Sequence, residues 1–241
     1  MLNGKRIVII LQARLSSSRL PNKVLLPIGA NFVPMLRILT ESILLLDCVD
    51  SCYVAIPNNE ESKLLSNNIA SSVNIFKGDL YNVFSRFYSI CENEEESIVI
   101  RMTADNPIII EDLFSEAVCK HIESENDYTY TEGLPLGCNF EIFNASSMLK
   151  IEMNDLTASE LEHVTLHFKN SDKFKTGTIK FETSIKDYRL TLDEFSDYCF
   201  VQALSNKIEL GLVNYKNLEQ ILLENVYLKN INTHVVQKVC N

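Results

Sequence analysis

Four short, almost wholly apolar runs punctuate the first hundred residues, and stretches with helical spacing of apolar positions lie between them. Runs of this length are typical of strands that are buried on both faces. We expect strands over residues 6–11, 51–57, 73–78 and 97–102, and helices over residues 34–47, 60–71 and 79–95. This alternation predicts an α/β fold, with a mostly parallel sheet and helices on both of its faces.

The second half of the chain alternates less regularly. A helix entered through Pro107 is expected over 108–124, and an amphipathic helix over 156–171 has Thr157 as its N-cap and Glu160 three residues later. Further strands are expected over 127–132, 138–144, 173–181 and 187–193, and further helices over 194–209 and 216–240. Because no repeat, linker or low-complexity segment interrupts the chain, we expect a single domain over residues 1–241.

Composition narrows the classes of function. The 241 residues carry a formal net charge of −10, which argues against general nucleic-acid binding, since that needs a basic surface. No apolar run approaches the ~20 residues that span a bilayer, so no membrane insertion is expected. The seven cysteines are scattered and complete no zinc motif, so we interpret them as free thiols of a cytoplasmic protein.

The loop after the first strand is unusually basic for an acidic protein. It runs "LQARLSSSRLPNKVL" over residues 11–25, and it contains neither a Walker A motif nor a dinucleotide-binding glycine pattern. Ligands of parallel sheets bind at the carboxyl ends of the strands, and guanidinium and ammonium groups suit phosphate oxygens. The loop is therefore a candidate phosphate cradle, and a solvated basic turn is the alternative. Its candidate ligand groups are Arg14, Arg19, Lys23 and the hydroxyls of Ser16, Ser17 and Ser18.

Two carboxylates also follow apolar strands. Asp105 comes after the strand 97–102, and Asp193 ends the short strand expected over 187–193. Carboxylates at strand ends suit a hard cation such as Mg²⁺, and without a cation two such groups would repel each other. The alternatives are an Asp-Asn-Pro turn at Asp105 and a helix cap by Asp193 with Glu194 in the first turn. Together with the basic loop, the pair indicates nucleotidyl transfer.

At these residues the chain resembles a known family, the cytidylyltransferases that activate acidic sugars of the acylneuraminate and 3-deoxy-octulosonate type. Within them it is most similar to the SpsF-like branch of polysaccharide-biosynthesis proteins. The segment "QARLSSSRLPNKVL" matches that branch's Q-A-R-x-x-S-x-R-L-P-x-K-V-L. Five shorter matches follow in the family's order: "KGDLYNVFSRFY", "IVIRMTADNPII", "CNFEIF", "ELEHVTLHF" and "RLTLDEFSDY". The chain departs from the family at Asn82, Ala104 and Asn139, where Asp, Gly and Asp are usual.

The resemblance implies a nucleotide-diphospho-sugar-transferase-like (Rossmann-like) fold, CTP as donor, Mg²⁺ as cofactor, release of pyrophosphate and a homodimer. Gln12, Ala13 and Arg14 would read the cytosine, and the basic and serine groups of the loop would hold the phosphates. Thr103 joins this nucleotide-binding set. Lys23, Arg14 and Asp105 would be catalytic, and Asp105 and Asp193 would hold the metal. The acceptor side would comprise Arg86, Arg101, Asn139, Glu141, Glu162 and His163.

Several alternatives stay open from sequence. Arg86 and Arg101 could contact an anionic substrate or only pair with nearby acids. His163 and His167 stand four residues apart on a helix, but the pattern lacks a third zinc ligand, and we expect His167 to be a packing residue. The acceptor could be a nonulosonic acid or a phosphate monoester. A sugar-nucleotide glycosyltransferase and a non-catalytic nucleotide-binding protein of the same fold are the competing functions.

Overall fold

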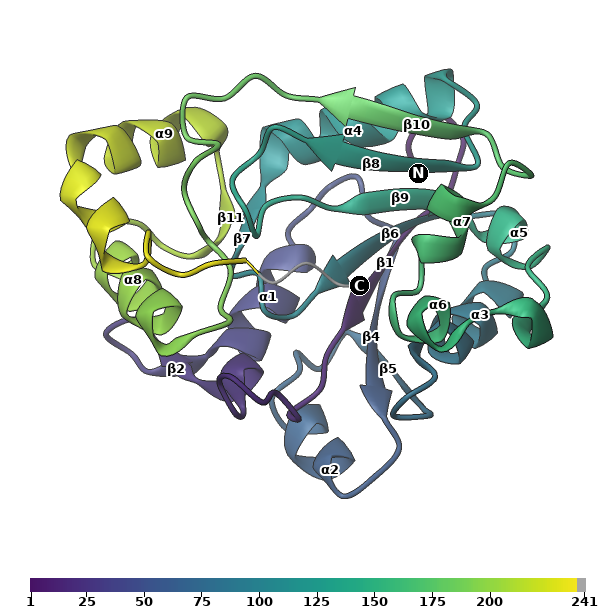
Figure 1. Cartoon of the computed structure of the whole chain (residues 1–241), viewed down its shortest axis with the longest axis horizontal. Coiled ribbons are helices and arrows are strands. Elements are labelled where there is room, and N and C mark those ends of the chain that lie inside the picture. The colour runs from purple at the N-terminus through teal and green to yellow at the C-terminus, as the bar shows by residue number, and fades with distance from the viewer. Residues whose placement is uncertain (238–241) are drawn as a thin grey trace.

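A seven-stranded sheet runs through the middle of the molecule (Figure 1). The structure, a computed structural model, describes residues 1–237. Six strands of the sheet run in parallel, and β9 alone runs against both of its neighbours, β6 and β8. The strand order is β10 (Thr176–Lys180), β8 (Tyr128–Glu132), β9 (Glu141–Asn144), β6 (Ile98–Thr103), β1 (Ile7–Gln12), β4 (Ser51–Pro57) and β5 (Asn74–Gly78). The mostly parallel sheet predicted from the apolar runs is therefore confirmed.

The central strand β1 is buried on both faces. Ile7, Ile9 and Leu11 belong to one hydrophobic cluster, whereas Val8 and Ile10 belong to another, as the alternation of side chains along a strand requires. The first cluster is completed by α1 (Met35–Ile43), α2 (Glu61–Ser66), α4 (Glu111–Glu123), α8 (Phe195–Ser205) and α9 (Tyr215–Glu224). The second is completed by α3 (Val83–Glu92), α5 (Ala145–Met148), α6 (Ala158–Glu162) and α7 (Leu166–Asn170).

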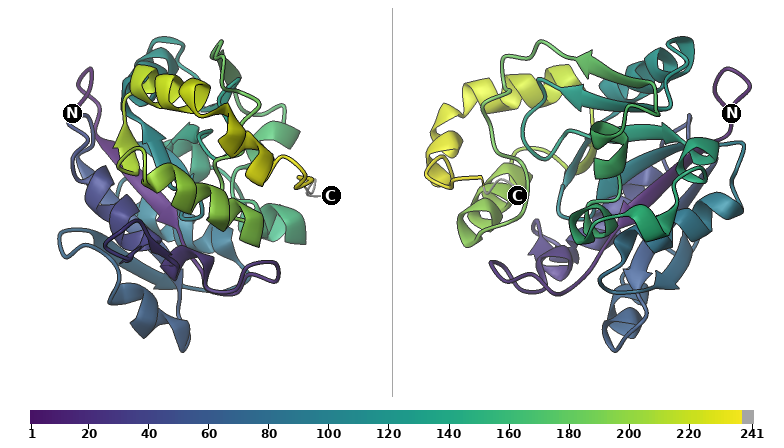
Figure 2. Two further views of the ribbon diagram at one scale, coloured as in Figure 1. Left: turned by 90° about the vertical axis from the view of Figure 1, so that its left-hand side faces the viewer. Right: turned by 45° about the vertical axis from the view of Figure 1, so that its right-hand side comes forward.

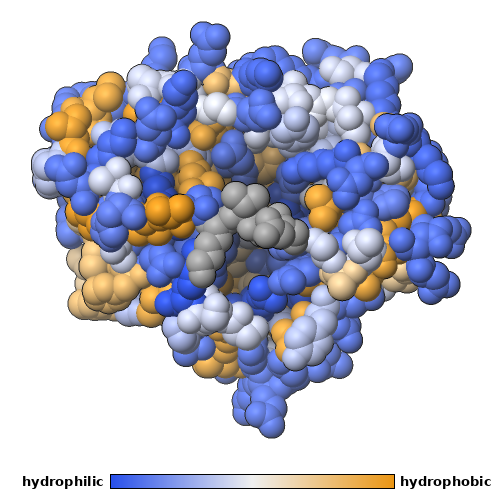
Figure 3. All heavy atoms as spheres, viewed as in Figure 1, coloured by the Kyte–Doolittle hydropathy of each residue, from blue (hydrophilic) through white to orange (hydrophobic). Residues whose placement is uncertain are grey.

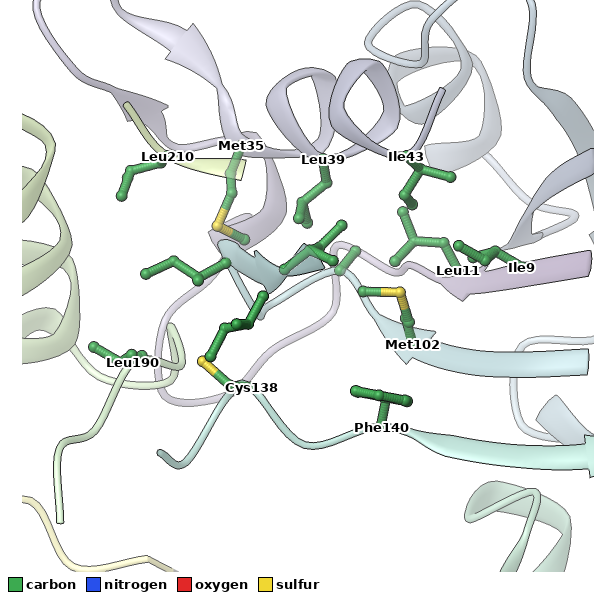
Figure 4. Close-up of a cluster of buried hydrophobic side chains, with 14 of the residues drawn as sticks. Ile9, Leu11, Met35, Leu39, Ile43, Met102, Cys138, Phe140, Leu190 and Leu210 are labelled. Carbon is green, nitrogen blue, oxygen red and sulfur yellow. The ribbon is translucent and has the colours of Figure 1, made fainter. Parts of the chain in front are cut away.

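The first cluster extends beyond the strands to the loops at their carboxyl ends (Figure 4). Met102 of β6 and Phe140, just before β9, lie in the same cluster as Leu39 of α1. Cys138 and Leu190 continue it beneath two segments without regular structure. These apolar anchors hold the loops in place, so the polar side chains beside them project from a rigid base.

The C-terminal helices pack together at one end of the molecule (Figure 1). There α8 packs with η3 (Val226–Ile231), next to α9 (Figures 1 and 2). Two small sheets complete the fold: β7 (Ile108–Ile110) pairs in parallel with β11 (Gly211–Val213), and β2 (Pro27–Ile28) pairs with β3 (Val33–Pro34). Single turns form η1 (Lys23–Leu25) and η2 (Met153–Asp155). None of the helices in residues 1–237 has the length and apolar composition that a bilayer crossing requires.

The structure corrects three of the expected elements. The helix expected over 108–124 begins only at Glu111, because the three β-branched isoleucines before it form β7 and pair with β11. The helix expected over 156–171 is broken into α6 and α7, although Thr157 and Glu160 form the predicted capping box. The segment 187–193 forms no strand, only a single bridge between Leu136 and Arg189.

The helix expected over 216–240 is a fourth correction, because α9 ends at Glu224, η3 follows it and residues 232–237 are not helical; residues 238–240 lie outside the described residues. The other expected elements are present with bounds that differ by a few residues at most ends. The N-cap of α8 is Glu194, not Asp193, and Asp197 completes its capping box. The six cysteines in residues 1–237 are all free thiols, and Cys240 lies outside that range.

Candidate functional site

The carboxyl ends of β1 and β6 lie side by side, with Gln12 paired to Thr103. The basic loop 13–25 rises from this edge and encloses a cavity of about 340 Å³. The structure therefore brings the nucleotide-binding candidates together around one space. Its walls are Gln12, Arg14, Ser16, Ser17, Ser18, Arg19, Lys23, Val24, Thr103, Ala104 and Asp105. Ala13 is the exception, because it is buried and its N–H donates to the Ala55 carbonyl at 3.2 Å.

A second cavity of about 330 Å³ opens next to the first, and Thr103 and Asp105 line both. Three of the acceptor candidates line it, namely Arg101, Asn139 and Glu141. Several other wall residues were not predicted from the sequence, among them Tyr130, Lys169 and Gln237. The face of the molecule in Figure 3 is hollowed near its middle, and the surface round the hollow is mostly hydrophilic.

The Lys23 ammonium lies between the two predicted metal ligands. Its Nζ is 2.6 Å from Asp105 Oδ2 and 2.7 Å from Asp193 Oδ1. Burial lowers the pKa of Lys23, but the two carboxylates raise it by more, so the net pKa lies above its ordinary value and the group is charged. The expectation that the two aspartates repel each other is therefore wrong, because a cation of the chain already separates them.

Arg189, a residue that was not singled out from the sequence, binds the Asp193 carboxylate on the side away from Lys23 through the other oxygen. Arg189 Nη2 lies 3.2 Å from Asp193 Oδ2, and its Nε and Nη2 bind the Asp197 carboxylate at 2.8 and 3.0 Å. Asp197 also accepts the N–H of Asp193 at 3.0 Å. Burial raises the pKa of Asp193, but Lys23 first, then Arg19 and Arg189, lower it by more, so its net pKa lies below the ordinary value of 3.8. Asp193 is therefore an ionised carboxylate in a fixed position.

Glu141 of β9 is the centre of the polar network in the second cavity. Its carboxylate accepts from Arg101 Nη1 at 2.5 Å, the Thr165 hydroxyl at 2.7 Å and the Tyr128 hydroxyl at 2.5 Å. Lys169 Nζ lies 2.9 Å from the same carboxylate. Burial raises the pKa of Glu141, but Arg101 and Lys169 outweigh it and bring the pKa to about 2. With all of these partners, Glu141 positions the surrounding cations and is a poor proton acceptor at neutral pH.

Glu162 comes from α6 to the rim of the first cavity, where its Oε1 lies 3.1 Å from Arg14 Nη2. Both side chains are about 40% exposed or more, so this pair is weak and can open when a stronger anion arrives. The loop itself is fixed by backbone contacts, since the Leu15 N–H donates to Glu61 Oε2 at 3.0 Å and Asn22 adopts the left-handed conformation. The guanidinium of Arg14 is thus free to move above a rigid loop.

Glu162 is not among the residues that line the two cavities, and two further acceptor candidates, Arg86 and His163, also line neither. Arg86 is fully buried, its Nη1 donates to the Ala55 carbonyl at 3.0 Å, and its Nε and Nη2 have no partner among residues 1–237. Burial, and then the nearby charge of Arg14, lower the pKa of Arg86 to about 10. His163 caps the C-terminus of α6 at the break before α7. His167 packs edge-on against Phe174 as expected, with ring centroids 6.2 Å apart, and its Nδ1 also lies 3.1 Å from Glu160 Oε1.

Gly137 joins the acceptor side to the segment that carries Asp193. Its φ is +100°, and a Cβ at this position would lie 2.6 Å from the Thr191 nitrogen. Next to it, the Leu136 N–H donates to the Tyr188 carbonyl at 3.1 Å, and the Leu190 N–H donates to the Leu136 carbonyl at 2.7 Å. Only a glycine permits this close approach of the two backbones.

Comparison with known proteins agrees with this geometry. Residues 8–233 match the sequence profile of the cytidylyltransferases. The chain belongs to the cytidylyltransferase family. It is 32% identical over 212 residues to the spore coat polysaccharide biosynthesis protein SpsF of Bacillus subtilis, covering 83% of this chain and 87% of that protein.

Solved structures of cytidylyltransferases share the fold. A cytidylyltransferase from Leptospira borgpetersenii superposes with a TM-score of 0.83 at 20% identity, over 98% of this chain and all of that one. CMP:2-keto-3-deoxy-manno-octonic acid synthetase, solved in complex with CTP, superposes with a TM-score of 0.60 at 15% identity, over 84% of this chain and 99% of that one. At these identities the likeness shows the fold alone, and it confirms the predicted class.

The donor set fits the Mg²⁺ that the resemblance to the cytidylyltransferases implies. Oxygens of Asp105 and Asp193 already converge on one cation, the Lys23 ammonium. Mg²⁺ takes oxygen ligands and is usually held by one or two carboxylates, with substrate phosphates and water completing the shell. No group of three or more His, Cys, Asp or Glu side chains in residues 1–237 could hold a metal by itself. The two aspartates therefore suit a metal that arrives with a nucleotide.

Proposed function

We propose that the chain transfers CMP from CTP to a small anionic acceptor, an acidic sugar or a phosphorylated compound, and releases pyrophosphate in a Mg²⁺-dependent reaction. One observation carries the proposal. The Lys23–Asp105–Asp193 cluster stands where a cavity lined by the basic loop meets a cavity lined by Arg101 and Lys169. The first space has mainly cationic walls, and the second holds two cations beside the carboxylates of Asp105, Glu141 and Asp193. Cations in both spaces suit two anionic substrates, and charged groups at their junction suit the transfer between them.

The first cavity takes the nucleotide in this proposal. Arg14 and Arg19 offer planar donor pairs to phosphate oxygens, and the serine hydroxyls add further donors. Gln12, at the end of β1, lies where a base could be read, and its Oε1 already accepts from Arg101 Nη2 at 3.2 Å. That bond links the nucleotide side to the acceptor side through a single side chain.

In the reaction, an oxygen of the acceptor attacks the α-phosphorus of CTP. The new P–O bond forms as the bond to the β-phosphate oxygen breaks, and that electron pair leaves with pyrophosphate. A hydroxyl acceptor also gives up its proton, which passes to solvent, whereas a phosphate acceptor is already ionised. Lys23, Arg14 and Arg19 would stabilise the charge that develops on the phosphates. Bound Mg²⁺ would supply Lewis-acid neutralisation of the phosphate oxygens at Asp105 and Asp193.

The experiment measures pyrophosphate release from CTP and Mg²⁺ with a panel of nonulosonic acids, 3-deoxy-octulosonate and sugar phosphates. Mass spectrometry then separates CMP-linked from CDP-linked products. Calorimetric titration should show tighter binding of CTP than of ATP, GTP or UTP. Equal affinity for ATP would contradict the cytidine assignment, and absence of product with every acceptor would favour a non-catalytic binding protein. The homodimer expected from the resemblance stays a prediction, and light scattering would test it.

A further inference from the structure

The last described residue, Gln237, is part of the wall of the second cavity. We call this space the acceptor cavity, because the proposed function leaves it for the acceptor. Gln237 lies beyond residue 233, where the match to the cytidylyltransferase profile ends. Figure 1 shows the segment after η3 running from the end of the molecule that holds α8 toward its centre. Gln237 therefore lies in the wall of this cavity although it falls outside the part of the chain that matches the profile.

The segment 232–237 is fixed by polar contacts. Asn232 is buried, and its Nδ2 donates to the Arg189 carbonyl at 2.9 Å and to Asp197 Oδ1 at 3.0 Å. His234 Nε2 lies 3.1 Å from the Ser196 hydroxyl. Arg189 Nη1 donates to Gln237 Oε1 at 2.5 Å. The segment is thus attached to the guanidinium that also supports Asp193.

Chemistry fixes the orientation of the Gln237 amide. A guanidinium only donates hydrogen bonds, so the atom that faces Arg189 must be the amide oxygen. The NH₂ group then remains for the cavity, and it has no acceptor among residues 1–237. Asn139 shows the reverse arrangement, because its Nδ2 lies 3.4 Å from the Pro135 carbonyl, which only accepts. Its amide oxygen is left for the cavity.

We infer that Gln237 and Asn139 recognise hydroxyl groups of the acceptor and thereby select a hydroxylated, sugar-like anion. A hydroxyl both donates and accepts, so one amide NH₂ and one amide oxygen together suit neighbouring hydroxyls of a polyol. The cations Arg101 and Lys169 in the same cavity suit its carboxylate or phosphate. This inference rests on the proposed function, because it assigns the second cavity to the acceptor.

The test compares Gln237→Leu and Gln237→Glu with wild type by calorimetry in the presence of CTP. The probes are N-acetylneuraminate and glucose 1-phosphate, with pyruvate and methyl phosphate as anions that lack hydroxyls. Wild type should bind at least one hydroxylated probe at least tenfold more tightly than its simple counterpart, and Gln237→Leu should lose about tenfold, the value of one lost contact of ~1.4 kcal/mol. The matched control is Gln220→Leu, the same change at an exposed glutamine of α9.

Gln237→Glu separates recognition from mere support of Arg189. A glutamate keeps the oxygen that Arg189 binds but replaces the NH₂ donor with a second acceptor. If Gln237 contacts the acceptor, Gln237→Glu binds the hydroxylated probe no better than Gln237→Leu, whereas its affinity for CTP changes less than twofold. Wild-type affinity in Gln237→Glu, equal binding of simple and hydroxylated anions, or no binding of any probe to wild type would each overturn the inference. If wild type binds ATP as tightly as CTP, the proposed function is overturned instead.

Discussion

The Lys23 ammonium donates to the Asp193 carboxylate across 2.7 Å and joins the loop after β1 to a segment 170 residues later. The same ammonium binds Asp105 at the end of β6. Lys23 is therefore both a candidate catalytic group and a tie between three parts of the chain. Substitutions at Lys23, Asp105 and Asp193 should therefore affect both folding and turnover.

Lys23→Met should destabilise the fold as well as abolish turnover. A lysine that only faced a cleft would leave the melting temperature unchanged, but this one is 14% exposed and separates two carboxylates. Removing one partner of a buried ion pair costs about 3 kcal/mol or more, and partial exposure of Asp105 places this case at the lower end. Urea unfolding measures the loss, with Lys186→Met, at an exposed position, as the control. An unchanged free energy of unfolding would refute the structural role.

Asp105→Asn and Asp193→Asn should each remove most of the Mg²⁺-dependent stabilisation by CTP and nearly all turnover. A ligand at a hundredfold excess over Kd stabilises the folded state by about 2.7 kcal/mol, so the loss is visible in melting curves. Without ligand both variants should melt below wild type, because Lys23 loses a partner. Asp193→Asn should melt lower, since Asp193 also binds Arg19 and Arg189. A Mg²⁺-dependent shift that survives in both variants would place the metal elsewhere.

Glu141→Gln should destabilise the protein at neutral pH and progressively less in acid. The pKa of Glu141 is about 2 in the fold against an ordinary value of 4.5, so its ion pairs stabilise the folded state fully above pH 4.5. That contribution, roughly 3 kcal/mol, is lost as the pH falls from 4.5 to about 2. Unfolding of wild type and variant at several pH values measures the difference. A gap that stays constant down to pH 2 would show that the carboxylate charge is irrelevant.

Arg86→Met should leave the melting temperature unchanged or raise it, whereas Arg86→Ala should lower it. The buried guanidinium makes one hydrogen bond and leaves Nε and Nη2 without a partner in the described chain, and an apolar side chain of similar volume removes that cost. The alanine variant instead leaves a void. Affinity for CTP should fall in both variants, because a positive charge close to Arg14 is lost. A strongly destabilised Arg86→Met variant would show that the Ala55 contact dominates.

The sequence predicts which residues meet around the first cavity. The apolar runs identify β1 and β6, and the carboxyl ends of adjacent parallel strands share one edge, so the basic loop and Asp105 had to meet. The residues around the second cavity were harder to predict from the sequence. Lys169 reaches Glu141 only because the expected helix over 156–171 breaks after His163, and the amphipathic pattern continues through that break without a signal.

Arg189 shows a second limit. The segment 187–193 alternates like a strand, yet its backbone bonds to Leu136 in a loop and not to the sheet. The prediction therefore placed Asp193 at the correct edge of the sheet, but it assumed a strand that does not form. The partners of Asp193, Arg189 and Asp197, lie only four residues before and after it, but their burial depends on packing against distant parts of the chain.

Gly137 narrows the routes by which this chain could change its acceptor. Filling the cavity from this position, the simplest way to exclude a bulky substrate, would push the backbone at Leu190 and Thr191 away and carry Asp193 with it. A larger residue at position 137 would disturb the cluster of Lys23, Asp105 and Asp193 before it changed which acceptor the cavity could hold. If the second cavity binds the acceptor, a change of acceptor is easier at a wall residue without such backbone contacts, such as Asn139.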